Sequence, residues 1–193
     1  METTVVMTLL RRLTRSHWFW IVLGTAVVGV TAASIFSSGE SSPPRAWIEP
    51  AEPRTAPNFT LDRLNGDAFR LKEHRGTVVV LNFWATWCPP CREEIPDFVN
   101  MQADLGDRGV QFVGVALERN PDPQAVRDFA EKMNVNYPIG LGDGSIAQKY
   151  GGIRGLPMTF VIGPEGEIRG RIPGRTTEER LRPALERLLE ETS

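Results

Sequence analysis

Residues 77–91 read Thr-Val-Val-Val-Leu-Asn-Phe-Trp-Ala-Thr-Trp-Cys-Pro-Pro-Cys, and this stretch decides the fold class. Its first eight residues are mostly β-branched or aromatic with almost no polar alternation, which is typical of a strand covered on both faces. Apolar side chains then recur at near-helical spacing from Ile95 to Leu105, and a second apolar strand is expected at 110–117. A strand, a helix and a strand in succession form a βαβ unit with parallel strands. We therefore expect an α/β fold.

Further elements are predicted on both sides of this unit. Asn65-Gly66-Asp67 lies between apolar residues and indicates a leading β-hairpin. Downstream we expect a helix beginning at Asp122-Pro123, a strand at 137–141, a short helix at 145–150 and a hairpin formed by 158–162 and 167–172. A capping box from Thr176 to Glu179 predicts a last helix, in which Pro183 predicts a kink or a start at Arg182 or Pro183.

The chain has only two cysteines, Cys88 and Cys91, and they are too close together to join distant parts of a fold. At the start of a helix the Cys88 sulfur would face the positive end of the helix dipole, which favours the nucleophilic thiolate, and Cys91 could resolve the mixed disulfide. Pro89 and Pro90 have no N–H to offer that sulfur. We therefore expect a Cys88 pKa below that of a free thiol but only moderately so, as in a reducing pair.

The same pair could be half of a zinc site, but zinc needs four ligands. No second Cys-x-x-Cys is present, and His17 and His74 are the only histidines. The net charge of −2, without a long run of either sign after the N-terminal segment, argues against a nucleic-acid partner.

The N-terminal region is predicted to be a membrane-targeting segment. Residues 18–36 are uncharged and mostly apolar, and as a helix they would span about 28 Å, close to the hydrocarbon thickness of a bilayer. Three arginines precede them, whereas Glu40 is the first charge after them, so residues 1–17 are expected in the cytoplasm. A linker rich in Ser and Pro (37–56) then leads to a folded domain (57–193). A cleaved signal peptide is the competing interpretation, and either outcome exports the domain.

Residues 82–96 (Asn-Phe-Trp-Ala-Thr-Trp-Cys-Pro-Pro-Cys-Arg-Glu-Glu-Ile-Pro), together with 155–162 (Gly-Leu-Pro-Met-Thr-Phe-Val-Ile) and 163–168, closely resemble the TlpA/ResA-like branch of the thioredoxin superfamily. The resemblance covers roughly residues 56–190. It implies a thioredoxin-like fold: a central mixed sheet flanked by helices, with an N-terminal β-hairpin and a strand-helix insertion at about 121–141. The single transmembrane helix would precede this domain.

The resemblance also assigns residues to the site. Pro157 would be a cis proline facing the cysteines, and the Leu156 backbone would pair with an extended substrate chain. Glu94 would lie near the active site as a proton acceptor or pKa modulator, although a solvated helix residue is the alternative. Asn82 takes the place of thioredoxin's buried aspartate and cannot titrate, so any carboxylate relay to Cys91 must come from Glu94 or water.

The expected function is an exported, membrane-tethered protein-disulfide reductant on the outer side of a bacterial cytoplasmic membrane. In family terms it would serve cytochrome c maturation, reducing apocytochrome c with electrons from a transmembrane thiol relay. A disulfide oxidant or isomerase is the first alternative, separated by the reduction potential. A copper metallochaperone is the second, with Met158 as the one candidate for an additional ligand. The site residues are then Cys88, Cys91, Glu94 and Pro157 for catalysis and Trp87, Pro89, Pro90 and Leu156 for substrate binding, with no metal and no cofactor beyond the redox-active disulfide.

Overall fold

The computed structural model describes residues 54–191. Within them no helix is long and apolar enough to cross a membrane, and the predicted anchor at 18–36 and most of the predicted linker lie outside the described residues.

A six-stranded mixed sheet forms the centre of the domain, with strand order β1-β8-β7-β4-β5-β6. The predicted central strand, β4, pairs in parallel with β5 and antiparallel with β7, so it is bonded along both edges. This confirms the βαβ unit. The strands of this sheet are β1 (Arg54–Thr55), β4 (Val78–Trp84), β5 (Val110–Ala116), β6 (Ile139–Leu141), β7 (Met158–Ile162) and β8 (Glu167–Pro173).

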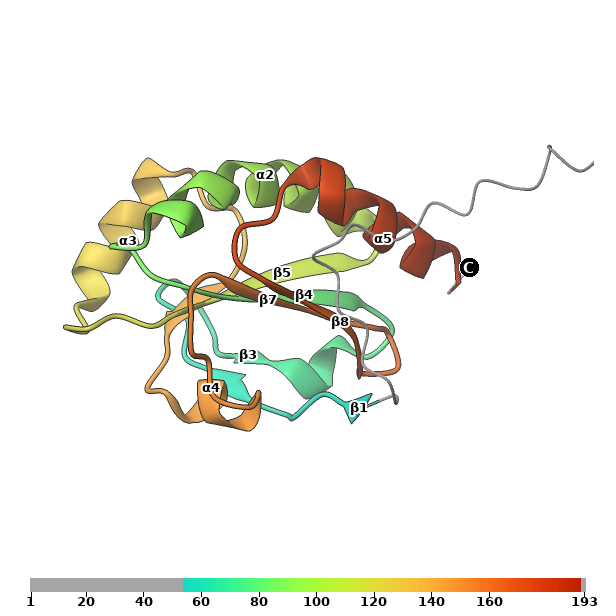
Figure 1. Ribbon diagram of the computed structural model, residues 1–193, viewed down its shortest axis with the longest axis horizontal. Coiled ribbons are helices and arrows are strands. Elements are labelled where there is room, and N and C mark those ends of the chain that lie inside the picture. Colours follow the sequence, from blue (N-terminus) through green and yellow to red (C-terminus); the bar gives the residue numbers. More distant parts are fainter. Residues whose placement is uncertain (1–53, 192–193) are drawn as a thin grey trace, which may run out of the picture. The chain divides into compact units, whose positions relative to one another are not determined.

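Helices cover both faces of the sheet (Figure 1). One face packs against α2 (Pro89–Leu105), α3 (Pro123–Lys132) and α5 (Glu178–Glu190). The other face packs against α4 (Ser145–Lys149), the 3₁₀ turn η1 (Leu71–His74) and the predicted hairpin, formed by β2 (Thr60–Leu61) and β3 (Phe69–Arg70). A second 3₁₀ turn, η2 (Gly106–Arg108), follows α2.

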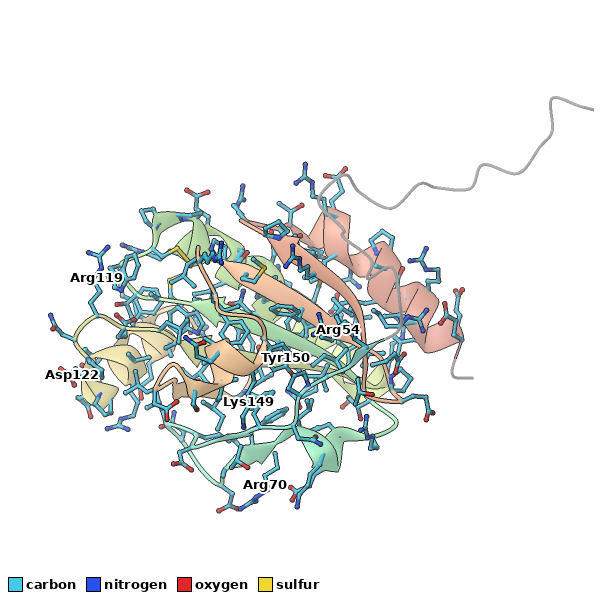
Figure 2. The ribbon with its side chains drawn as sticks, turned by 60° about the horizontal axis from the view of Figure 1, so that its bottom comes forward. Arg54, Arg70, Arg119, Asp122, Lys149 and Tyr150 are labelled. Atoms are coloured by element: carbon cyan, nitrogen blue, oxygen red, sulfur yellow. A yellow bond between two sulfur atoms is a disulfide. The ribbon has the colours of Figure 1, made fainter. Side chains whose placement is uncertain are left out.

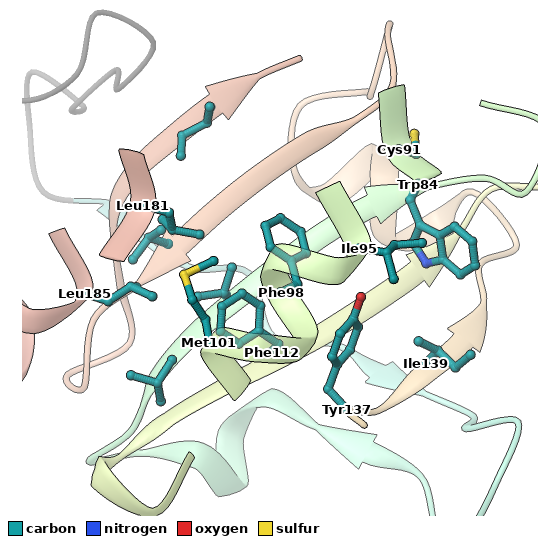
Figure 3. Packing of buried hydrophobic residues seen from close by; sticks show 14 of the residues in the cluster. Trp84, Cys91, Ile95, Phe98, Met101, Phe112, Tyr137, Ile139, Leu181 and Leu185 are labelled. Carbon is teal, nitrogen blue, oxygen red and sulfur yellow. The ribbon is translucent and has the colours of Figure 1, made fainter. Parts of the chain in front are cut away.

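The hydrophobic core therefore consists of two clusters separated by the sheet. Successive residues of β4 point alternately into them, so that Val80 belongs to the cluster under α2 and Leu81 to the cluster under α4. Figure 3 shows the first cluster, where the Phe98 ring of α2 packs on the Phe112 ring of β5 with centres 5.2 Å apart, and Leu185 of α5 belongs to the same cluster. Burial of each such side chain contributes about 1.5–3 kcal/mol. Because β4 is buried along its whole length, it holds in place the start of the segment that carries the two cysteines.

Two sequence predictions need correction. Arg54 and Thr55 form β1 against β8, and the Ala56 N–H bonds to the Gly166 carbonyl, so these residues belong to the folded domain and not to the linker. The exposed side chains of β1 give no apolar pattern, because only its backbone is engaged.

The last helix begins at Glu178 with Thr177 as its N-cap, so the predictions of a Thr176 cap and of a start at Arg182 or Pro183 are wrong. Pro183 is accommodated inside the helix, since the buried face formed by Leu181, Ala184, Leu185 and Leu188 holds the segment in place.

Candidate functional site

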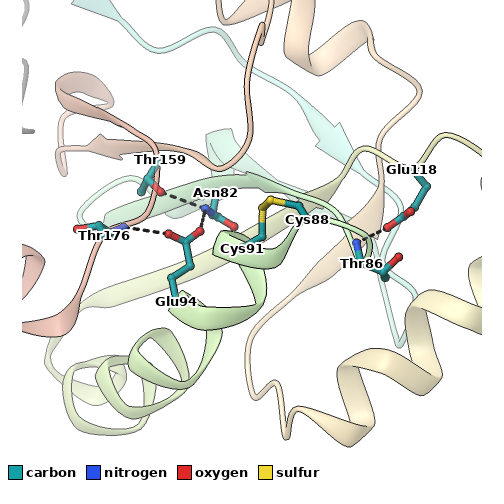
Figure 4. Close-up of a disulfide and its surroundings, with 8 residues drawn as sticks. All are labelled: Asn82, Thr86, Cys88, Cys91, Glu94, Glu118, Thr159 and Thr176. Carbon is teal, nitrogen blue, oxygen red and sulfur yellow. Dashed lines mark hydrogen bonds between the residues drawn. A yellow bond between two sulfur atoms is a disulfide. The ribbon is translucent and has the colours of Figure 1, made fainter.

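The two cysteines lie where β4 ends and α2 begins. Cys88 is the N-cap of α2, and Pro89 and Pro90 occupy the first helical positions, where a missing N–H costs no intrahelical bond. Cys88 and Cys91 form a disulfide with their Cα atoms 5.3 Å apart (Figure 4). The Cys88 residue is 4% exposed and Cys91 is 0% exposed, so Cys88 is the member that a partner can reach.

Glu94 is fully buried, so the alternative of a solvated helix residue is wrong. It follows Cys91 by three residues and precedes Phe98 by four, which places all three on the buried face of α2. Its Oε1 accepts a hydrogen bond from Asn82 Nδ2 at 2.8 Å, and its Oε2 accepts one from the Thr176 backbone N–H at 3.1 Å. Burial raises the pKa of Glu94 to about 8, although these two hydrogen bonds and the charge of Arg175 act in the lowering direction.

Asn82 fixes the position of this carboxyl group. Its Nδ2 also donates to the Thr159 hydroxyl at 3.0 Å, so both amide hydrogens are used. Figure 4 shows the resulting chain from Thr159 through Asn82 to Glu94 and Thr176 beside the disulfide.

Sequence reasoning missed two members of this network. Thr159 comes from β7 and Thr176 from the loop before α5, and both are fully buried. The Thr176 hydroxyl has no hydrogen-bond partner among the described residues. No local pattern links these threonines to Glu94, because they meet only through the sheet order. The Thr-x-x-Glu motif at Thr176 instead suggested a helix cap.

Most of the residues predicted to contact the substrate lie within two positions of Cys88 in the sequence. Trp87 is 44% exposed, Pro89 is exposed and Pro90 is half-buried. The Leu156–Pro157 peptide bond is cis, as the resemblance implied, and Pro157 is buried whereas Leu156 is half-buried. The roles of these residues in binding stay predictions.

An open pocket of about 730 Å³ lies beside the residues that follow β5. Three segments line it: the one that follows β5, the one that joins β6 to α4 and the one that leads to the cis peptide, including Glu118, Arg119, Asp143, Gly152 and Arg154. Sequence reasoning did not find it. Its walls come from segments that are far apart in the chain.

The chemistry open to this site is that of two sulfur atoms and one buried carboxyl group. Within residues 54–191, no group of three or more His, Cys, Asp or Glu side chains is placed to hold a metal. Copper, the metal considered above, would be held by the two thiolates of the reduced protein, with Met158 as the candidate for an additional ligand.

The AhpC/TSA family profile matches residues 53–171. The thiol-disulfide oxidoreductase ResA of Bacillus subtilis is 36% identical over 129 residues, covering 66% of this chain and 70% of that protein. ResA of Halalkalibacterium halodurans is 32% identical over 173 residues, covering 87% and 93%. A thioredoxin-family thiol:disulfide interchange protein from Chlorobium tepidum TLS has a TM-score of 0.67 at 32% identity, covering 72% of this chain and 99% of that one. The chain therefore belongs to the AhpC/TSA family, and within the thioredoxin superfamily it is a ResA/TlpA-like thiol-disulfide oxidoreductase.

Proposed function

We propose that this oxidoreductase is an exported, membrane-tethered reductant of protein disulfides, and that it serves cytochrome c maturation. The observation that carries the proposal is the asymmetry of the cysteine pair: Cys88 keeps 4% of its surface exposed at the start of α2, whereas Cys91 is fully buried on the same helix as the buried Glu94. One sulfur is placed to meet a partner and the other to release it.

The reaction follows from this arrangement. In the reduced protein, the Cys88 thiolate attacks a partner disulfide, so that a bond between Cys88 and the partner sulfur forms and a partner thiolate leaves. The Cys91 thiol then gives its proton to Glu94 in its ionised form, which a pKa of about 8 leaves as the minor form at neutral pH. The resulting Cys91 thiolate attacks Cys88, the second partner thiolate leaves, and the Cys88–Cys91 disulfide forms. Two electrons pass from the protein to its partner.

Glu94 suits the proton step because its pKa of about 8 is close to that of a cysteine thiol. A carboxyl group with an ordinary pKa would accept the proton far less readily. Asn82 cannot replace it, because an amide does not titrate at neutral pH.

The two prolines between the cysteines support the reducing direction. Pro89 and Pro90 remove two N–H donors from the first turn of α2, so the Cys88 thiolate is stabilised less than in a pair with free donors. A thiolate held less strongly makes the reduced form the better electron donor. A midpoint potential near the oxidising extreme of about −120 mV would contradict a reducing role.

The proposed location and partners rest on the N-terminal sequence and on the resemblance to the TlpA/ResA-like branch. The apolar residues 18–36, preceded by arginines, support a single-pass anchor in a bacterial cytoplasmic membrane with the domain outside. There the electrons would come from a transmembrane thiol relay, and the substrate would be an oxidised apocytochrome c.

Trapping tests the whole proposal. A full-length Cys91→Ser variant in its native membrane should stall as a mixed disulfide through Cys88, because the resolving thiol is missing. The control is the double variant Cys88→Ser/Cys91→Ser, which should trap nothing. Recovery of apocytochrome c supports the maturation role. Recovery of a copper-site protein, or of nothing beyond the control, would overturn it.

A further inference from the structure

The two residues immediately before Cys88 are held by two consecutive residues that follow β5. The Thr86 backbone N–H donates a hydrogen bond to Glu118 Oε1 at 2.7 Å. The guanidinium carbon of Arg119 lies 4.1 Å from the centre of the Trp87 ring, within the range of a cation–π interaction. Figure 4 shows the Thr86–Glu118 bond on the side of the disulfide opposite to Glu94.

The register of the sheet explains why Thr86 and Trp87 lie beside the residues that follow β5. The parallel register of β4 and β5 ends at Trp84 opposite Ala116, and the Leu117 N–H continues the ladder to the Trp84 carbonyl at 2.8 Å. The two chains therefore leave the sheet at the same level. Glu118 and Arg119 are placed by two buried strands and not by a free loop.

Trp87 is the exposed residue of the segment before Cys88. It is the one large hydrophobic side chain among residues 54–191 that is exposed, and it directly precedes the accessible cysteine. The Cys88 N–H bonds to the Ala85 carbonyl at 3.2 Å, which closes a turn over these residues. Glu118 satisfies the Thr86 donor within that turn, and Arg119 holds the Trp87 ring. Arg119 itself lies at the surface, shortly before Asp122 and α3 (Figure 2).

We propose that Glu118 and Arg119 are positioning residues for thiol–disulfide exchange. They fix the Thr86–Trp87 segment, and through it the orientation of the Trp87 ring towards the partner polypeptide and the charges around the Cys88 sulfur. This inference rests on the proposed function, in which Cys88 attacks the partner disulfide. Neither residue touches the reacting sulfur atoms in the mechanism above.

Glu118 and Arg119 carry opposite charges, so substituting them should have opposite effects on the Cys88 pKa. The Glu118 carboxylate disfavours a nearby Cys88 thiolate, whereas the Arg119 guanidinium favours it. Glu118→Gln should therefore lower the Cys88 pKa and Arg119→Ala should raise it, each by a few tenths of a unit at low salt, roughly as expected for partly exposed charges. A loss of stability alone would not shift the two variants in opposite directions.

The test uses the reduced full-length protein. The pH dependence of Cys88 alkylation by iodoacetamide reports the pKa, and rapid mixing with a synthetic peptide that contains one disulfide reports the half-saturating concentration and the limiting rate. Arg119→Ala should raise the half-saturating concentration about two- to fivefold, the factor that an exposed cation–π contact is worth. The limiting rate should change less than about twofold, because the sulfur chemistry is untouched. Arg119→Lys, which keeps a cation over the ring, should restore most of the loss.

Arg171→Ala is the matched control, since Arg171 is an exposed arginine on β8 with no side-chain contact to the segment before Cys88. The inference is overturned if Arg119→Ala binds the peptide like the wild-type protein, or if Arg171→Ala shows the same change as Arg119→Ala. It is also overturned if Glu118→Gln and Arg119→Ala shift the Cys88 pKa in the same direction. A wild-type protein that does not reduce the peptide would instead refute the proposed function. Glu118→Gln keeps the size of the side chain, so the direction in which it shifts the Cys88 pKa still decides the question if Arg119→Ala fails to fold.

Discussion

Glu94→Gln tests whether the carboxyl group beside the disulfide is held neutral by burial. In the folded protein the Glu94 pKa is raised from 4.5 to about 8, whereas in the unfolded chain it returns to its ordinary value. Between these two pH values the folded protein binds a proton that the unfolded chain does not, so stability falls as the pH rises. At about 1.4 kcal/mol per pKa unit, the wild-type protein should lose about 5 kcal/mol between pH 4.5 and pH 8 through this group.

The glutamine variant lacks this dependence but has a cost of its own. Glu94 accepts hydrogen bonds from both Asn82 and Thr176, whereas a glutamine side chain has one acceptor oxygen and turns an NH₂ group towards the other donor. That mismatch should destabilise the variant by about 1–3 kcal/mol at every pH. The variant is therefore clearly less stable than the wild-type protein near pH 5, and the difference shrinks or reverses above pH 8.

Urea titrations of the oxidised full-length protein at several pH values from 5 to 9 measure this difference. The control is Glu93→Gln, because Glu93 is the exposed neighbour on α2 and pairs with Arg175 at the surface. Its effect should stay below about 1 kcal/mol across the range. A stability difference between the Glu94→Gln and wild-type proteins that is constant from pH 5 to 9 would refute the argument that Glu94 is buried in its neutral form.

Three further substitutions test the packing around the site. Asn82→Ala leaves Glu94 and Thr159 without their shared donor and should cost about 1–3 kcal/mol in urea unfolding, together with a changed pH dependence. Asp122→Ala removes the side-chain cap that accepts the N–H groups of Gln124 and Ala125, and should lower the free energy of unfolding by about 1 kcal/mol. Leu185→Ala opens a cavity in the fully buried interface of α5 and should cost about 2–5 kcal/mol in the same assay, with the reactivity of Cys88 unchanged.

The sequence predicted the elements whose pattern is local. The strands β4, β5 and β7 lie within about one residue of their predicted ends, because unbroken β-branched and aromatic runs occur only where both faces are covered. Asp122 with a proline after it correctly predicted the start of α3, and its side chain caps that helix. The burial of Glu94 was also readable in principle, because the residue shares the apolar helical spacing of Cys91 and Phe98.

The sequence could not predict contacts between distant segments whose residues follow no recognisable pattern. The edge strand β1 is held by backbone bonds alone. Thr176 meets Glu94 across the fold, and Thr177 instead of Thr176 is the N-cap of α5. Glu118 and Arg119 follow a strand as ordinary polar residues do, and only the common end of β4 and β5 brings them to Thr86 and Trp87.

The unequal burial of the two sulfur atoms also determines how the reduced protein withstands oxidative damage. A peroxide reaches Cys88 first, because Cys91 is fully enclosed, and converts it to a sulfenic acid. Cys91 lies close enough to attack that sulfur, which releases water and forms the same disulfide that the protein adopts after each turnover. The lesion thus becomes an ordinary intermediate before further oxidation to sulfinic acid can make it permanent. In the proposed function, the electron donor that restores the dithiol after reaction with a partner would repair it as well.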